Sequence, residues 1–276
     1  METSNSVIID ELKVCYRTNF DTLTPFMAVA TGETLYYGEY RFYRMGNSRF
    51  RYFFTIMDSK GEIGQLKFGL YSEATNAPTS YVFLKIQNMV LYDPERLARI
   101  LTLPDEMGME FNNYTQIDLA FDTRVNVPSL IKRLLRDKTI TTIINGKAIK
   151  DRKKVQDGVC FEYSTSLDRL KHPSITFKQR KAVSNKNEGI TIQAYDKKSE
   201  IDNHSGKQYI LEYYGHPKQL YRLEVRLPYQ ELKDYCSHLN TIHPAELVTN
   251  QPALQDMFFY HLAAVLRFRK GRVILQ

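Results

Sequence analysis

Alternating apolar and polar residues predict several strands in the first half of the chain. Residues 36–43 and 50–57 alternate and are rich in aromatic side chains, and residues 63–71 and 81–91 follow the same period of two. The polar run 58–62 between two of these segments predicts a hairpin turn. The first half is therefore expected to be β-rich.

Helix signals appear where this alternation stops. Asp93 followed by Pro94 is typical of an N-cap and a first helical position, and predicts a helix over about 95–103. A second helix is expected over 128–136, where apolar residues recur at helical spacing. Beyond Pro228 the pattern is helical, over residues 229–239, 244–249 and about 253–270.

Strand patterns return between these helical segments, at residues 116–122, 140–144, 158–165, 174–180, 189–198 and 220–227. This order predicts an α+β protein with a largely antiparallel, curved sheet and helices on one face, rather than regular βαβ winding. The helices at 95–103 and 128–136 should cover the apolar face. We expect a β-rich domain over 1–228 and a helical C-terminal region over 229–276.

Three of these strands carry acids, bases or a tyrosine on one face, because side chains alternate along a strand. Each has an apolar opposite face. The polar residues are Asp118 and Asp122 on the first strand, Tyr195 and Lys197 on the second, and Arg222, Glu224 and Arg226 on the third. If the strands share one sheet, carboxylates and a phenol collect beside cations, which suits a metal-dependent tyrosine nucleophile acting on a phosphodiester.

The acids Asp118, Asp122 and Glu224 are the candidate metal ligands. No His-x-His pair occurs in the sequence, so a metal would be held by oxygen ligands, which suits Mg²⁺ or Mn²⁺. Asp118 and Asp122 lie roughly 13 Å apart in a straight strand, so Asp118 is the better ligand unless the strand bulges. The alternative is that these acids are surface groups, with Glu224 in a cross-strand pair with arginine.

Three short motifs resemble the Rep_trans-type family, which comprises rolling-circle replication initiators of plasmids and filamentous phages and relaxases of conjugative transposons. They are I-D-L-A-x-D at 117–122, Y-D-K-K-x-E at 195–200 and R-L-E-V at 222–225, in the family's order. The resemblance implies a Mg²⁺- or Mn²⁺-dependent single-strand nick at an origin, which leaves the protein on the 5′-phosphate through a tyrosine.

One strand departs from the family pattern. The family places its tyrosine in a T-x-Y-x-G-S segment, but residues 174–180 contain no tyrosine, and Thr176 stands at the expected position. Three explanations remain. Tyr195 is the nucleophile, with Lys197 holding the phosphate or stabilising the phenolate; Tyr163 is the nucleophile; or the chain is inactive. We favour Tyr195, and the competing function is a non-enzymatic DNA-binding protein.

Positive charge is concentrated beside the candidate site. Residues 147–186 hold eleven Lys and Arg against four Asp and Glu, a net charge of +7 that equals that of the whole chain. Such a segment is typical of a surface that contacts the phosphate backbone of DNA. The candidate DNA-binding residues are Lys150, Arg152, Lys153, Lys154, Lys178, Arg180 and Lys181. Expected partners are single-stranded or cruciform origin DNA, a host helicase and a second copy of the chain, with no membrane.

Composition excludes several other classes. The sequence has no apolar run of about 20 residues, no apolar leader and no P-loop motif, so a membrane protein, a secreted protein and an ATP-driven motor are not expected. Three scattered cysteines favour reduced thiols in the cytoplasm. The aromatic residues at 36–43 favour packing over base stacking.

Overall fold

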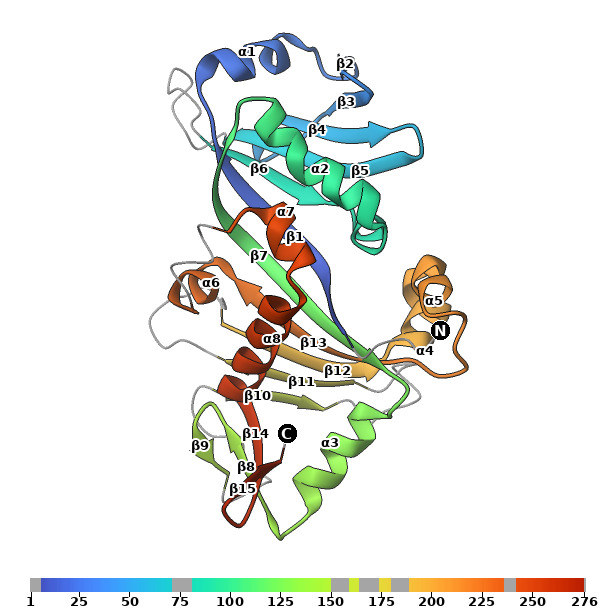
Figure 1. Ribbon diagram of the computed structural model, residues 1–276, viewed down its shortest axis with the longest axis vertical. Coiled ribbons are helices and arrows are strands. Elements are labelled where there is room, and N and C mark those ends of the chain that lie inside the picture. The colour runs from blue at the N-terminus through green and yellow to red at the C-terminus, as the bar shows by residue number, and fades with distance from the viewer. Residues whose placement is uncertain are drawn as a thin grey trace. The chain divides into compact units, whose positions relative to one another are not determined.

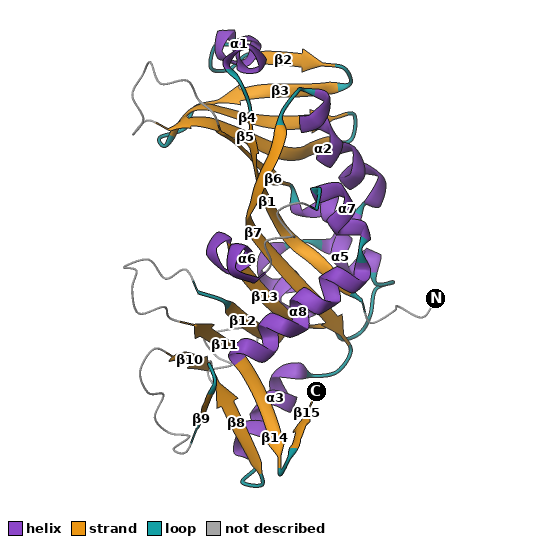
Figure 2. Cartoon of the chain, turned by 60° about the vertical axis from the view of Figure 1, so that its left-hand side comes forward, coloured by secondary structure: helices purple, strands orange, loops and turns teal. Residues whose placement is uncertain are grey.

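The structure is a computed structural model that describes residues 6–70, 81–149, 159–163, 174–179, 189–235 and 242–275, with the backbone alone for 159–163 and 275. Its strands are β1 (Val7–Arg17), β2 (Thr34–Tyr37), β3 (Tyr40–Met45), β4 (Phe50–Asp58), β5 (Gly61–Leu70), β6 (Tyr81–Ile86), β7 (Glu110–Thr123), β8 (Ile140–Ile144), β9 (Lys147–Ala148), β10 (Val159–Tyr163), β11 (Ser174–Gln179), β12 (Thr191–Asp196), β13 (Tyr221–Pro228), β14 (Leu266–Lys270) and β15 (Val273–Leu275). Its helices are α1 (Phe20–Ala28), α2 (Pro94–Glu106), α3 (Val127–Arg136), α4 (Lys197–Glu200), α5 (Gln208–Tyr213), α6 (Tyr229–Tyr235), α7 (Pro244–Thr249) and α8 (Gln251–Val265), with a 3₁₀ turn η1 (Asn88–Tyr92) and a π turn η2 (Ile201–Ser205) (Figures 1 and 2).

These elements form two sheets. The larger has the strand order β10-β11-β12-β13-β7-β1-β6-β5-β4-β3-β2, and the smaller has the order β15-β14-β8-β9. Antiparallel pairing joins β1 to β6, β2 to β3, β3 to β4, β4 to β5, β5 to β6, β8 to β14, β10 to β11, β11 to β12 and β12 to β13. The predicted α+β class with a large antiparallel sheet is therefore confirmed.

The chain divides into two compact units. The N-terminal unit comprises Asp10–Ile117 and Leu232–Thr249, and the C-terminal unit comprises Met1–Ile9, Asp118–Glu231 and Asn250–Gln276. The expected boundary at residue 228 lies inside the C-terminal unit. A division of this kind is difficult to predict from sequence, because each unit is assembled from segments far apart along the chain.

An aromatic cluster forms the core of the N-terminal unit. The ring of Phe26 in α1 lies 5.1 Å from Phe42, 5.5 Å from Phe54 and 6.5 Å from Phe68, measured between centroids. These three strand residues are fully buried. Helix α1 therefore packs on the face of the sheet that carries them, and offset or edge-on ring pairs of this kind add to the stabilisation from burial.

Helix α2 begins where the sequence predicts, because the Asp93 side chain accepts a hydrogen bond from the Arg96 amide and Pro94 occupies the first turn. It continues to Glu106, three residues beyond the expected end, with Pro104 inside its last turn. The segment 81–91 is a strand only to Ile86, and η1 follows it.

In the C-terminal unit, one face of the strands is apolar and covered by helices. Ile175, Phe177, Ile192 and Val225 are fully buried on this face. Helix α3 packs against β12 and β13, and helix α8 packs against β11 and β13, with Phe258 6.3 Å from Phe121 between ring centroids. Cover by the helix at 128–136 is confirmed. Helix α2, at the predicted 95–103, packs on β5, a strand of the same sheet that belongs to the N-terminal unit.

The predicted helix over 253–270 is wrong in its last five residues. Helix α8 ends at Val265, and β14 begins at Leu266 and pairs with β8, with Leu266 opposite Ile144 and Phe268 opposite Thr142. Leu266 and Phe268 are buried while Arg267 and Arg269 lie outside the core, which is the period of two that a strand requires. Alternation over only five residues is too short to distinguish from the end of a helix.

None of the helices in the described ranges is long and apolar enough to span a bilayer.

Candidate functional site

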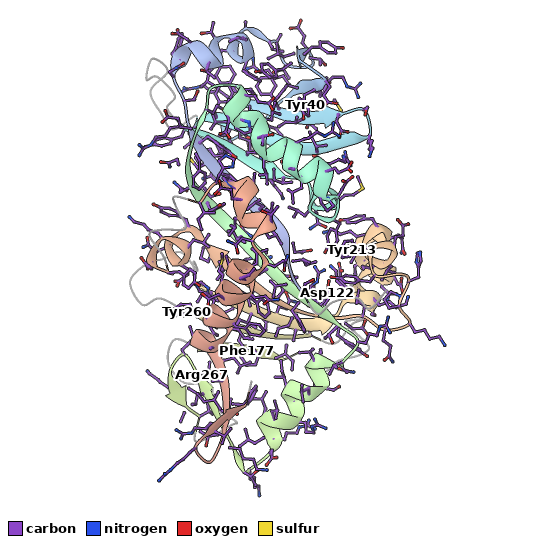
Figure 3. All side chains as sticks on the ribbon, viewed as in Figure 1. Tyr40, Asp122, Phe177, Tyr213, Tyr260 and Arg267 are labelled. Carbon is purple, nitrogen blue, oxygen red and sulfur yellow. The ribbon has the colours of Figure 1, made fainter. Side chains whose placement is uncertain are left out.

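The polar face of the C-terminal sheet brings the predicted site strands together. Strand β12 pairs with β13, which places Gln193 opposite Glu224 and Tyr195 opposite Arg222. Strand β7, which carries Asp118 and Asp122, is the other neighbour of β13. The three motif strands are therefore adjacent in one sheet, so the polar side chains on their alternating faces collect on the same side. Asp122 and, two strands beyond β13, Phe177 are labelled in Figure 3.

Four side chains on this face form a continuous chain of contacts. The Tyr195 hydroxyl donates a 3.0 Å hydrogen bond to Oε2 of Glu224. Nη2 of Arg226 lies 3.5 Å from Oε1 of Glu224, and Nε of the same guanidinium donates to Oδ2 of Asp118 at 2.8 Å. We call Tyr195, Glu224, Arg226 and Asp118 the phenol–acid chain.

Burial makes the phenol–acid chain electrostatically distinctive. Tyr195, Glu224 and Asp118 are 6%, 8% and 1% exposed, whereas the Arg226 side chain is 51% exposed. Buried carboxylates require a cation or hydrogen bonds to remain charged. Arg226 supplies that charge to both acids from the solvent side.

Lys197 lies beside the tyrosine ring. It is the first residue of α4 and is 3% exposed, with Nζ 5.5 Å from the centroid of the Tyr195 ring and 2.9 Å from Oε2 of Glu200. Burial raises the pKa of Glu200, but the charge of Lys197 and its hydrogen bond outweigh that effect, so the net pKa lies below its usual value. The Lys197–Glu200 pair fixes the ammonium against the ring, where a cation–π contact is favourable.

The Y-D-K-K-x-E segment also has a local structural role. Asp196 is the N-cap of α4, and its Oδ1 accepts a 2.9 Å hydrogen bond from the Ser199 amide. The motif thus ends β12 at Asp196, which caps the helix α4 that starts at Lys197. Asp196 and Lys197 thus have structural partners within the motif, whereas Tyr195 contacts Glu224 of the neighbouring strand.

Asp122 lies in a different environment from Asp118. Its two carboxylate oxygens accept hydrogen bonds from Nε and Nη2 of Arg222 at 2.7 and 2.6 Å, and neither side chain is exposed. The Tyr214 hydroxyl also bonds to Asp122, and burial, followed by the charge of this carboxylate, raises the pKa of Tyr214 well above its usual value. This geometry makes Asp122 an anchor for Arg222.

The fit of a divalent ion rests on Asp118 and Glu224. Among the residues that the structure describes, no three His, Cys, Asp or Glu side chains gather as a ligand group. Mg²⁺ is often held by one or two carboxylates, with waters and substrate phosphates completing its coordination. Asp118 and Glu224, joined by the half-exposed guanidinium of Arg226, fit that description, whereas the oxygens of Asp122 are taken by Arg222. The three metal-ligand assignments remain predictions.

Strand register separates the candidate nucleophiles. Position 163 is directly opposite Ile175, which is fully buried in the apolar core. Thr176 is directly opposite Gln193, which is in turn opposite Glu224. Residues directly opposite in a sheet share a face. The backbone therefore places position 163 on the apolar side and position 176 on the side of the acids, as alternation along residues 174–180 predicts.

Only part of the predicted DNA surface can be placed. Lys178 is opposite Thr191, which in turn is opposite Arg226, so Lys178 continues the row of cations across the polar face. The other candidates, Lys150, Arg152, Lys153, Lys154, Arg180 and Lys181, lie outside the described residues.

Two features of the site go beyond the sequence analysis. Alternation predicts that Arg222 and Arg226 lie on the face of Glu224. It does not predict which acid each arginine contacts, because that depends on the lateral register of β13 against β7. Tyr214 follows the short helix α5, and no pattern in the sequence connects it with Asp122.

No protein-family model and no curated protein matches this chain. Among solved structures, it is similar to the rolling circle replication initiator protein from Geobacillus stearothermophilus, with a TM-score of 0.47 and 13% sequence identity. The alignment covers 97% of this chain and 89% of that chain. The likeness is a distant one, so the case for a function rests on the site itself.

Proposed function

We propose that the chain is a DNA-nicking and strand-transferring protein that uses Tyr195 as its nucleophile, in the manner of a rolling-circle initiator or relaxase. The observation that carries this proposal is the hydrogen bond from Tyr195 to Glu224. A phenol with a pKa near 10 is a weak nucleophile at neutral pH unless a base accepts its proton or a cation stabilises the phenolate. Glu224 is the base that accepts the proton, and Lys197 is the cation that stabilises the phenolate.

The reaction is a transesterification at phosphorus. The Tyr195 oxygen attacks the scissile phosphate and forms a new P–O bond, and its proton passes to Glu224. The bond from phosphorus to the 3′-oxygen breaks, which leaves a free 3′-hydroxyl on one strand after protonation and a 5′-phosphotyrosine on the other. The step needs no oxidant or nucleotide, because one phosphodiester is exchanged for another.

The cations of the site act on charge that develops in this step. Lys197 lies over the Tyr195 ring and stabilises the phenolate. Asp118 and Glu224 would hold a Mg²⁺ or Mn²⁺ ion, which supplies Lewis-acid polarisation of the phosphate when bound. Arg226 bridges the two acids and offsets part of their negative charge when no ion is present. Lys178 and the basic segment 147–186 position the DNA backbone.

A second candidate function is DNA binding without nicking. Thr176 occupies the row of Glu224 where the resembling family is expected to have its tyrosine, and Tyr195 is 6% exposed. In that case the phenol–acid chain is a structural network that holds β12, β13 and β7 together.

The deciding experiment is covalent transfer to the protein. The chain is incubated with Mn²⁺ and a random-sequence pool of 3′-labelled single-stranded DNA, and labelled protein is detected after denaturation. The nicking proposal expects a labelled band that EDTA and Tyr195→Phe abolish. Tyr260→Phe is the matched control, because Tyr260 is 56% exposed on α8, and its band should persist. Absence of a band from the wild type, with DNA binding retained, would favour the non-enzymatic function.

A further inference from the structure

The sheet of the N-terminal unit has a second face, away from α1 and α2. Phe42, Phe54 and Phe68 point to α1, and the Tyr37 hydroxyl donates to the backbone oxygen of Glu106 in α2, at 2.8 Å. Side chains next to these in sequence point the other way. Tyr36 is among them, and it is 70% exposed.

Strand register arranges this second face in rows of rings and cations. One row runs from Cys15 through Phe83, Lys67 and Phe53 to Met45, across β1, β6, β5, β4 and β3. The next row runs through Lys13, Lys85, Gln65, Thr55, Tyr43 and Thr34, and beside it Tyr36 lies opposite Arg41. Rows are spaced by about 6.6 Å and strands by about 4.8 Å. We call these residues the outer rows.

Cations and rings touch within this face and beside it. Nζ of Lys67 lies 5.0 Å from the centroid of the Phe53 ring. The Arg49 guanidinium lies 5.6 Å from the Phe50 centroid, and Phe50 lies 5.9 Å from Phe83. The aromatic faces are therefore next to positive charge, an arrangement in which a stacked base and its phosphate can both be contacted.

The charge of this region is positive. Lys13, Lys67, Lys85 and Arg49 lie in or beside the outer rows and outnumber the carboxylates there. These are Glu11, which lies 2.5 Å from Lys13 and 3.7 Å from Lys85, and Glu62, which accepts a 3.4 Å hydrogen bond from Gln65. Burial lowers the pKa of Lys67, and the charges of Lys85, Lys13 and Arg49 lower it further, which reports their mutual repulsion. An anionic ligand would relieve that repulsion.

We propose that the outer rows bind single-stranded DNA, with lysines contacting phosphates and Tyr36, Phe53 and Phe83 stacking on bases. Stacking needs unpaired bases, so a duplex would leave the rings unused. A protein partner fits less well, because protein–protein interfaces are depleted in lysine. The face does not depend on Tyr195, so this binding site goes beyond the proposed nicking function.

Binding is tested with fluorescein-labelled dT12 and the full chain carrying Tyr195→Phe, in EDTA, so that no covalent product forms. Tyr36→Ala removes an exposed ring without disturbing the core and should weaken binding at least about fivefold. Lys67→Gln with Lys85→Gln should weaken it about tenfold at low salt and reduce the slope of log affinity against log salt by about 1.4, from roughly 0.7 per phosphate contact.

Matched controls are Phe20→Ala, which removes an exposed ring on α1, and Lys60→Gln, which removes an exposed lysine in the β4–β5 turn. Both should bind dT12 as the parent does. Photocrosslinking with iodouracil-substituted oligonucleotide should label peptides of β2–β6. The proposal is overturned if the parent does not bind dT12, if Tyr36→Ala and the lysine pair bind like their controls, or if oligo-rU is strongly preferred. A missing covalent adduct would refute nicking and leave these results unaffected.

Discussion

Tyr195 and Glu224 are joined by a 3.0 Å hydrogen bond although they are not directly opposite in the sheet. Glu224 lies opposite Gln193, and Tyr195 lies opposite Arg222, so the phenol reaches diagonally to the acid two residues along β13. Diagonal neighbours are within reach of a long aromatic side chain. This diagonal contact is what turns two unremarkable strand residues into a candidate nucleophile and base.

Replacement of Glu224 by glutamine tests this relationship. Glu224→Gln keeps the size and a hydrogen-bond acceptor but removes the negative charge that receives the proton. Adduct formation should fall by about 10²- to 10⁴-fold, the usual contribution of a general base, while binding of single-stranded DNA is retained. The rate of covalent labelling is the measurement, and Glu212→Gln, at an exposed position on α5, is the control. An unchanged rate in Glu224→Gln would remove Glu224 from the mechanism.

The buried pair of Asp122 and Arg222 should behave as a stabilising anchor. Arg222→Met leaves Asp122 buried without its cation and should lower the free energy of unfolding by about 3–5 kcal/mol. Urea unfolding measures the loss. The exposed pair of Lys198 and Asp202 provides the comparison, since Lys198→Met should cost less than about 1 kcal/mol. Equal effects of the two changes would show that burial of the Arg222 pair contributes little.

The sequence was informative about the faces of the site strands because alternation is local. Asp118, Glu224 and Tyr195 lie where a period of two places them, and Ile175 and Phe177 are fully buried as expected. The pairing of each acid with its arginine was not predictable, because it requires the register of strands that are about 100 residues apart in sequence. The same limit explains why cover of β11 and β13 by α8 was not predicted.

A pH-dependent contribution to stability is expected from Asp58 and Arg96 in the N-terminal unit. Two hydrogen bonds of 2.9 and 3.0 Å join the buried side chains. Burial raises the pKa of Asp58, but hydrogen bonds from Arg96 and from backbone amides outweigh it, so the pKa falls below its ordinary 3.8. A lowered folded pKa means that the stabilisation is complete above pH 3.8 and is lost as the pH falls through the folded value.

Arg96→Met should therefore destabilise the protein most near neutral pH, by about 3–5 kcal/mol, because the buried carboxylate stays charged without its cation. As the pH falls, Asp58 takes up a proton and the difference from wild type should shrink. Urea unfolding at several pH values between neutral and about 3 measures this difference. Arg99→Met, at an exposed ion pair with Glu39, is the control and should show little effect. A difference that stays constant with pH would contradict the linkage to Asp58.

The last prediction concerns the close approach of β11 to the start of β12, the strand that carries Tyr195. A Cβ atom at Gly189 would lie 1.8 Å from the backbone oxygen of Gln179, whose amide donates to the Ile190 oxygen at 2.9 Å. Gly189→Ala must push the two segments apart, and we expect a loss of about 2 kcal/mol or more in unfolding free energy. Gly46→Ala is the matched control, because a Cβ there meets nothing within 4 Å and should leave stability unchanged or raise it by up to about 1 kcal/mol. If both alanine variants unfold at the same urea concentration, the strands do not approach at Gly189 as closely as the structure has them.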